Sequence, residues 1–221
     1  MTFRSDINGL RALAVILVVL YHFDLFYFKG GFVGVDVFFV ISGFLMTSII
    51  TKGASSNEFS FISFYKSRAQ RIVPALAAVC LAVAIIGWFT LLPSDYKSLG
   101  KHGVSSLLFA SNIVYFSEAG YFDTLSHTKL LLHTWSLSIE WQFYLIYPVI
   151  LIAISKYLGA KHLPICLILL TLVSFSLAAS SSSQNASATF YLLHTRFWEL
   201  AFGGIIFFIS DKTSYTSKYY Y

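Results

Sequence analysis

The chain has 221 residues, of which 57% are hydrophobic and only 11% are charged. A soluble domain has about a quarter charged residues, so this composition and the mean hydropathy of +0.73 exclude an ordinary soluble protein. Several apolar runs approach about 20 residues, the length of one membrane crossing. The net charge of +5 is therefore interpreted as membrane topology and not as a nucleic-acid-binding surface. We predict an all-α, polytopic bundle of transmembrane helices in a lipid bilayer.

The first apolar run, Leu10–Phe28, is long enough to cross a bilayer as one helix. It contains Arg11 at its start and His22 well inside, eleven residues apart. At about 100° per residue, both side chains lie on nearly the same helix face, about 16 Å apart along the axis. Ionisable groups at membrane depth are usually functional. Taken singly, Arg11 also suits an interfacial anchor, and His22 a hydrogen bond between helices.

The rest of the chain predicts about six full spans in all and one shorter segment. The run Val104–Phe116 is too short to cross and predicts a re-entrant or interfacial segment. Phe59–Arg71 resembles an amphipathic interfacial helix that leads into the third span, with Pro74 in the first turn of that span and Pro93 at its end. The further predicted spans are Phe32–Ile50, Ile72–Leu92, Leu137–Leu158, Leu163–Ala179 and Phe190–Ile209.

The distribution of lysine and arginine favours this topology with both termini in the cytoplasm. If Val104–Phe116 does not cross, ten basic residues lie inside and four outside, and Arg196 is left out as embedded in the membrane. If it crosses, the count is seven on each side. The ten inside are Arg4, Arg11, Lys52, Lys66, Arg68, Arg71, Lys156, Lys161, Lys212 and Lys218, and the four outside are Lys29, Lys97, Lys101 and Lys129. The loop Ser180–Ala188 is then outside.

Polar residues gather at two levels in this topology. His22, Asp36 and Glu140 are expected to share the outer level, where a carboxylate beside an imidazole would raise its basicity, as a general base needs. A structural hydrogen-bonded cluster is the alternative. Arg11, Arg68 and Arg71 are expected at the inner surface, where three guanidinium groups suit a ligand rich in phosphate. Anchoring of the helices at the inner surface is the alternative there.

Five stretches of the chain, in this order, resemble the membrane-bound acyltransferase 3 family over essentially the whole sequence. The family's arginine and histidine separated by ten residues fall on Arg11 and His22, its RxxR motif on Arg68 and Arg71, and its acidic residue before QFY on Glu140. Many members have a second acidic residue where this chain has Trp141. The stretches are SDINGLRALAVILVVLYHF, GGFVGVDVFFVISGFLMT, FYKSRAQRIVPAL, LLHTWSLSIEWQFYLIYP and TRFWELAFGG.

The resemblance implies a bacterial inner-membrane enzyme that moves an acyl group, usually acetyl, from cytoplasmic acyl-CoA to a hydroxyl of an envelope glycan. Lipopolysaccharide O-antigen, peptidoglycan and exopolysaccharide are the acceptors it implies. His22 would be the catalytic base or transient acyl carrier, and Glu140 and Asp36 are the other catalytic candidates. Arg11, Arg68 and Arg71 would hold the phosphates of acetyl-CoA, a donor substrate. The sequence predicts no permanently bound cofactor and no metal.

The resemblance also implies a longer protein. Family members usually have more membrane helices, and many continue into an extracytoplasmic SGNH hydrolase-like domain. Residues 1–221 are therefore expected to form a transmembrane domain that is truncated at its C-terminal end. Two other functions stay open from the sequence, a component of a glycan or proton-coupled transporter and an inactive truncated remnant.

Overall fold

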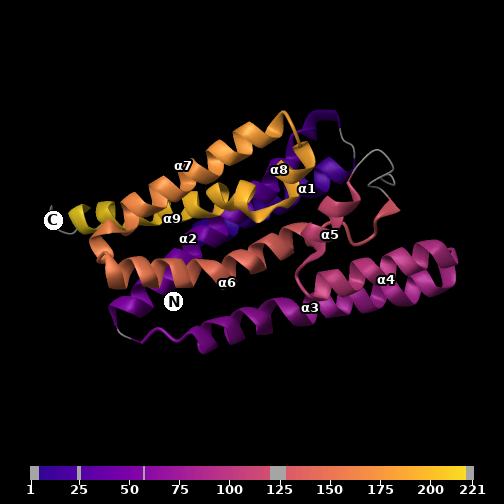
Figure 1. Ribbon diagram of the computed structural model, residues 1–221, viewed down its shortest axis with the longest axis horizontal. Coiled ribbons are helices and arrows are strands. Elements are labelled where there is room, and N and C mark those ends of the chain that lie inside the picture. Colours follow the sequence, from indigo (N-terminus) through magenta and orange to yellow (C-terminus); the bar gives the residue numbers. More distant parts are fainter. Residues whose placement is uncertain (1–4, 24–25, 57, 120–127, 218–221) are drawn as a thin grey trace. The chain divides into compact units, whose positions relative to one another are not determined.

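The computed structural model describes residues 5–23, 26–56, 58–119 and 128–217, and these residues form helices joined by turns, with no strand among them (Figure 1). Among the described helices, five are long and apolar enough to cross a membrane. They are α1 (Ser5–His22), α2 (Gly34–Ser55), which continues the short helix η2 (Gly31–Val33), α3 (Phe61–Thr90), α6 (Thr134–Tyr157) and α7 (Leu163–Ser182), which follows η4 (Ala160–His162). The predicted all-α polytopic bundle is confirmed.

The sixth predicted span, Phe190–Ile209, is divided between two helices. The chain is extended at Leu192, which separates α8 (Ala186–Tyr191) from α9 (Leu193–Ser217). Helix α9 is long enough to cross a membrane but is not one of the five apolar helices, and its first two turns contain Arg196 and Glu199. Length and composition therefore support five spans in the described residues, one fewer than predicted.

Two predicted boundaries are wrong. His22 is the last residue of α1 and does not lie well inside a span. The predicted interfacial helix and the third span form one helix of 30 residues, α3, so Pro74 lies inside a helix and not in its first turn. Charged side chains on a helix surface do not end a helix. The capping residue lies earlier, at Ser60, whose side chain accepts a hydrogen bond from the backbone N–H of Ser63.

The segment Val104–Phe116 does not form one continuous helix, as expected for a run too short to span. Helix α4 (Pro93–Leu107) ends within it, and α5 (Ser111–Glu118) begins after a tight turn. Phe109 in this turn has φ of 54°, a left-handed conformation that is rare for a bulky residue. Residues 120–127, which follow α5, lie outside the described residues.

The chain divides into two compact units. Unit 1 comprises Met1–Ser55, Ile150–Phe175 and Phe197–Tyr221, and unit 2 comprises Ser56–Val149 and Ser176–Arg196. In unit 1, α2 packs directly on the backbone of α9. A Cβ added at Gly43 would lie 1.7 Å from the backbone oxygen of Leu200, and one added at Gly203 would lie 2.0 Å from that of Val40. Only glycine allows these two helices to approach so closely.

Unit 2 contains an antiparallel pair of helices, α3 and α4, that lie side by side (Figure 1). Their shared core is formed by Leu76, Cys80, Leu99, Phe109 and Leu131. The Phe109 ring also stacks on Trp141 of α6, with ring centroids 4.4 Å apart. The strained turn after α4 is thus held by an aromatic contact within the same unit.

Candidate functional site

Helix α1 carries the first predicted pair on one unbroken helix. Arg11 is partly buried and His22 is exposed, and their spacing places them about 16 Å apart along the axis. The Nδ1 of His22 lies 2.7 Å from the carbonyl oxygen of Val18. A carbonyl only accepts hydrogen bonds, so Nδ1 must be the donor. In the neutral ring the basic lone pair then lies on Nε2.

The packing of α1 against the start of α2 fixes the height of Asp36. A Cβ added at Gly31 would meet the backbone oxygen of Leu17, and one added at Gly34 would meet that of Ala14, so the two segments are antiparallel. Asp36 lies two residues beyond Gly34, so it is near Ala14 along the axis of α1. This position is about 12 Å from His22, toward the N-terminal end of α1. The expectation that His22 and Asp36 share one level is not supported by this register.

A second register, within unit 2, relates the RxxR motif to Glu140. The hydroxyl of Tyr65 on α3 donates a 3.0 Å hydrogen bond to the carbonyl oxygen of Leu145 on α6, and the two helices run in opposite directions (Figure 1). Arg71 lies six residues after Tyr65, and Glu140 lies five residues before Leu145. Measured along the helix axes, Arg71 and Glu140 therefore lie on the same side of this hydrogen bond, at about 9 Å and about 8 Å from it. Arg71 and Glu140 lie at nearly one level, not at opposite membrane surfaces as the topology suggested.

Glu140 has a tyrosine partner one turn later on α6. The hydroxyl of Tyr144 donates a short hydrogen bond to Oε1 of Glu140. Tyr144 is only 6% exposed, so its packing restricts the position of the hydroxyl. A carboxylate held by a buried donor keeps one orientation, which suits a group that must face a reacting atom.

The predicted site residues belong to different units. Arg11, His22 and Asp36 are part of unit 1. Arg68, Arg71 and Glu140 are part of unit 2. The structure thus holds Arg11 and His22 on one helix and brings Arg71 level with Glu140. A single site formed by both sets stays a prediction.

Sequence reasoning did not identify an amide network that organises unit 2. Nε2 of Gln142 donates to the carbonyl oxygen of Phe109 at 3.0 Å and to Oδ1 of Asn112 at 2.8 Å. Nδ2 of Asn112 in turn donates to the carbonyl oxygen of Tyr191 at 3.0 Å. Gln142 therefore ties the strained turn after α4 to the end of α8. Its place after Glu140 and Trp141 in the family motif is the only signal the sequence offers.

Arg196 is stacked on aromatic rings at the corner between α8 and α9. Its guanidinium carbon lies 5.1 Å from the centroid of the Phe190 ring and 5.7 Å from that of the Trp135 ring. Its Nε donates to the carbonyl oxygen of Phe190 at 3.2 Å. Next to it, the buried Thr195 hydroxyl donates to the carbonyl oxygen of Leu192 at 2.8 Å. The sequence marked Arg196 as embedded but gave it no role.

Three basic side chains converge on the carboxylate of Glu118. Lys101 Nζ lies 2.6 Å from Oε1, and His102 Nε2 and Lys129 Nζ lie 2.9 Å and 3.4 Å from Oε2. Burial alone would raise the pKa of Glu118, but the hydrogen bonds from Lys101 and His102 outweigh it, so the pKa is lowered. The cluster ties α4 and α5 to the chain that follows residues 120–127.

Replacing Glu118 by glutamine is expected to destabilise the protein by about 3 kcal/mol, because the buried Lys129 loses a counter-charge. A carboxyl group whose pKa is lowered by folding stabilises the fold at pH values above its ordinary pKa of about 4.3. This contribution is lost as the pH falls through the lowered pKa. The difference in thermal stability between wild type and E118Q should therefore narrow below about pH 4. Lys101 is 55% exposed, so the matched K101Q variant should lose less than about 1 kcal/mol. Equal losses in both variants would show that the cluster is not a buried ionic centre.

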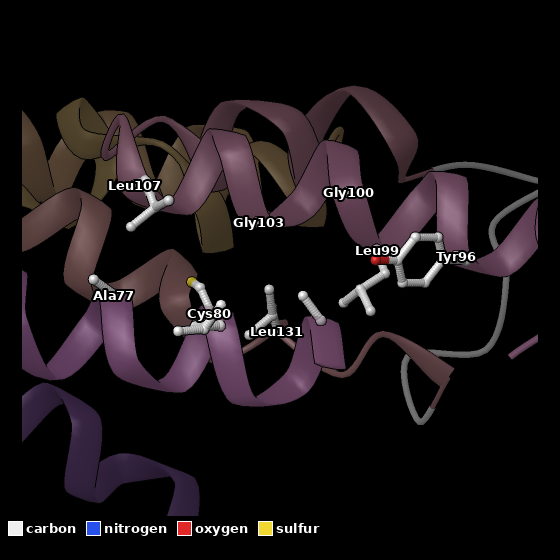
Figure 2. A pocket seen from close by; sticks show the side chains of 10 residues that line it. Ala77, Cys80, Tyr96, Leu99, Gly100, Gly103, Leu107 and Leu131 are labelled. Atoms are coloured by element: carbon white, nitrogen blue, oxygen red, sulfur yellow. The ribbon is translucent and has the colours of Figure 1, made fainter. Parts of the chain in front are cut away.

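A cavity of about 280 Å³ lies between α3 and α4, apart from the predicted site residues (Figure 2). Its walls include the small residues Ala77, Cys80 and Ala84 of α3 and the glycines Gly100 and Gly103 of α4. The lining is almost entirely apolar, and none of the six predicted site residues takes part in it. Among the residues that line it, only Cys80 and Tyr96 carry a nucleophilic or titratable group.

The motifs and the helical fold agree with a comparison to known families. The family model described as an acyltransferase domain matches residues 4–218. The chain therefore belongs to the acyltransferase 3 family. No solved structure matches the chain significantly.

Two relatives are similar to the chain over part of their own length. The O-acetyltransferase OatA of Staphylococcus aureus is 32% identical over 212 residues, which cover 94% of this chain and 35% of the relative. The peptidoglycan O-acetyltransferase OatA of Listeria monocytogenes is 35% identical over 154 residues, covering 69% of this chain and 25% of the relative. The chain thus spans about a third of the length of the Staphylococcus relative.

Proposed function

We propose that the chain is a membrane O-acyltransferase that moves an acetyl group from cytoplasmic acetyl-CoA to a hydroxyl of an envelope glycan. Family membership and the two relatives named O-acetyltransferases support the class of reaction. The relative from Listeria is named for peptidoglycan, which makes peptidoglycan the first acceptor to test. The proposed location is the bacterial cytoplasmic membrane, with the N-terminus in the cytoplasm.

The observation that carries this proposal is the arrangement of Arg11 and His22 on α1. Arg11 would bind a phosphate of CoA, and Nε2 of His22 would remove the proton from the attacking hydroxyl or carry the acetyl group transiently. The two are separated by about 16 Å, which suits a donor with a long, flexible arm between its phosphates and its thioester. CoA has such an arm in pantetheine.

The remaining predicted residues take unequal parts in this proposal. Arg68 and Arg71 would bind further phosphates of the donor, because the forked donors of guanidinium match phosphate oxygens. Glu140, oriented by Tyr144, stays a catalytic candidate, but its place at the level of Arg71 does not make it the partner of an imidazole about 16 Å from the donor phosphates. Asp36 is not proposed as a partner of His22, since the α1–α2 register carries it about 12 Å away along the axis.

The direct test is acetyl transfer in membranes. Inverted membrane vesicles that contain the chain and enclose a peptidoglycan or lipid-linked glycan acceptor are supplied from outside with radiolabelled acetyl-CoA. We expect labelled, alkali-labile acetyl esters on the glycan, above the level in vesicles without the chain. Label that never exceeds this background, while the folded protein is present, would count against the proposal.

The Arg71→Gln variant should raise the KM for acetyl-CoA by about 10- to 100-fold, because one charge-assisted hydrogen bond to phosphate is lost. The kcat should change much less, because the group binds far from the reacting carbonyl. Steady-state kinetics with varied acetyl-CoA measure both values. Lys66 is exposed on the same helix, and K66Q is the charge-matched control. Equal increases in KM for R71Q and K66Q would assign the effect to general surface charge.

A further inference from the structure

The imidazole of His22 has an aromatic neighbour at the end of α1. The ring of Tyr21 and the ring of His22 form a T-shaped pair, with centroids 5.2 Å apart and planes at 87°. Rings arranged in this way attract each other through the quadrupole of the aromatic system. The contact is separate from the hydrogen bond that Nδ1 of His22 donates to the Val18 carbonyl. At least two contacts therefore restrain the imidazole.

Tyr21 is itself supported by η2. Its ring forms a second T-shaped pair with the ring of Phe32, with centroids 5.7 Å apart and planes at 68°. The backbone of η2 lies close to α1 here, because a Cβ added at Gly31 would lie 2.2 Å from the carbonyl oxygen of Leu17 and 2.9 Å from Cβ of Tyr21. Glycine permits this close approach of one backbone to another. The Tyr21 ring is thus held between η2 and the imidazole.

The hydrogen bond of His22 alone does not determine where Nε2 points. A bond from Nδ1 to the Val18 carbonyl leaves the ring free to tilt about the line that joins the two atoms, and χ2 of histidine has broad minima. His22 is exposed, so water competes for Nδ1 when the ring tilts. A contact with the Tyr21 ring restricts the tilt and keeps Nδ1 on the carbonyl.

We propose that Tyr21 is a positioning residue for His22. Its ring, supported by Phe32, keeps the imidazole in the orientation and tautomer that present a basic Nε2. This inference rests on the proposed function, in which Nε2 accepts the proton of the hydroxyl or carries the acetyl group. A reacting group that is misplaced by about 1 Å can lose about 100-fold in rate, so a neighbour that restricts the ring matters for catalysis. Tyr21 acts through His22 and needs no contact with either substrate.

Two purely structural roles for Tyr21 make different predictions. Tyrosine is common at the boundary between membrane and water, where it anchors a helix. The contact between Tyr21 and Phe32 would also hold η2 on α1 without any effect on His22. Either role would affect the stability of the protein or the depth of α1 in the membrane. Neither would change the tautomer of the His22 ring.

The test compares Tyr21→Leu with Tyr21→Phe in the purified 221-residue chain in detergent, with ¹⁵N-labelled histidine. Ring-nitrogen chemical shifts at alkaline pH, where the ring is neutral, give the ratio of the Nδ1- to the Nε2-protonated form. The spectrum of H22N identifies the His22 signals by their absence. We expect the Nδ1-protonated form to predominate in wild type, and the ratio to fall about 2- to 10-fold in Y21L, the range of one aromatic pair.

Two variants should keep the wild-type ratio. Y21F keeps the ring and loses only the hydroxyl. F23L is the matched control for Y21L, because it also replaces an aromatic ring next to His22 in the sequence, and Phe23 is 74% exposed.

Steady-state acetyl transfer in proteoliposomes gives an independent measurement. In Y21L the kcat should fall by up to about tenfold. The KM for acetyl-CoA should stay within about twofold of wild type, because Arg11 still binds the donor. Y21F and F23L should resemble wild type in both values.

The positioning role is overturned if Y21L keeps the wild-type tautomer ratio, or if its kcat falls no more than that of F23L. A loss in Y21F as large as that in Y21L would assign the effect to the Tyr21 hydroxyl and would overturn the ring contact as well. A changed tautomer ratio in Y21L, with no acetyl transfer by wild type, would contradict the proposed function alone, because the spectra need no turnover.

Discussion

Replacing His22 by alanine is expected to lower acetyl transfer by about a thousandfold, the middle of the range for loss of a general base. The structural reason is the tautomer of the neutral His22 ring. With Nδ1 donating to the carbonyl of Val18, Nε2 is the only basic ring nitrogen in the neutral form. His22 is exposed at the end of α1, so its removal should disturb packing little. The initial rate of transfer at saturating acetyl-CoA measures the effect.

The matched variant is His22→Asn. The asparagine amide can take over donation to the Val18 carbonyl, but it has no basic nitrogen. H22N should therefore be as inactive as H22A while its thermal stability stays within about 1 kcal/mol of wild type. Substantial activity in H22N would mean that His22 contributes only its local hydrogen bond, and base or acyl-carrier chemistry would have to be assigned elsewhere.

The largest expected effect on stability comes from Gly43→Ala. The added Cβ would lie 1.7 Å from the backbone oxygen of Leu200, and backbone cannot move aside as a flexible side chain can. Helices α2 and α9 would have to separate, which destabilises a close-packed interface by about 3 kcal/mol or more. Thermal unfolding in detergent should show a lower midpoint, and activity should fall because α2 packs against α1, which carries His22.

Gly9→Ala is the matched control for this substitution. Gly9 also lies in a helix, but nothing lies within 4 Å of an added Cβ there. Alanine is intrinsically favoured over glycine in a helix interior by about 1 kcal/mol, so G9A should be neutral or slightly stabilising. If G43A is no less stable than G9A, the two helices do not approach as closely as the backbone of unit 1 indicates.

The sequence predicts the membrane-spanning character of the fold well because apolar runs near about 20 residues have few alternatives in a bilayer. The ends of the helices were harder to predict. Helix α3 extends through Arg68 and Arg71 because arginine is a good helix former, so the change from polar to apolar residues at Ile72 does not mark the start of a helix. The lysine and arginine count favoured a topology in which Val104–Phe116 does not cross the membrane, and the break in the helix at Phe109 agrees with it.

Pairings between helices could not be predicted from the sequence. Topology alone places residues near one membrane surface or the other. The hydrogen bond from Tyr65 to Leu145 and the contacts of Gly34 determine how neighbouring helices are aligned along their axes, which the ends of the spans do not show. They bring Arg71 level with Glu140 and move Asp36 away from His22. Arg196 was recognised as embedded, but the rings that orient it come from α6 and α8, far apart in the sequence.

Sidedness of transfer tests the central proposal most directly. The purified chain is reconstituted in proteoliposomes that hold a peptidoglycan fragment inside, and radiolabelled acetyl-CoA is added outside. We expect labelled ester on the enclosed glycan for wild type and none above protein-free liposomes for H22N. Enclosed glycan that stays unlabelled in the presence of folded wild-type protein, or that is labelled equally by H22N, would contradict transfer across the membrane through His22.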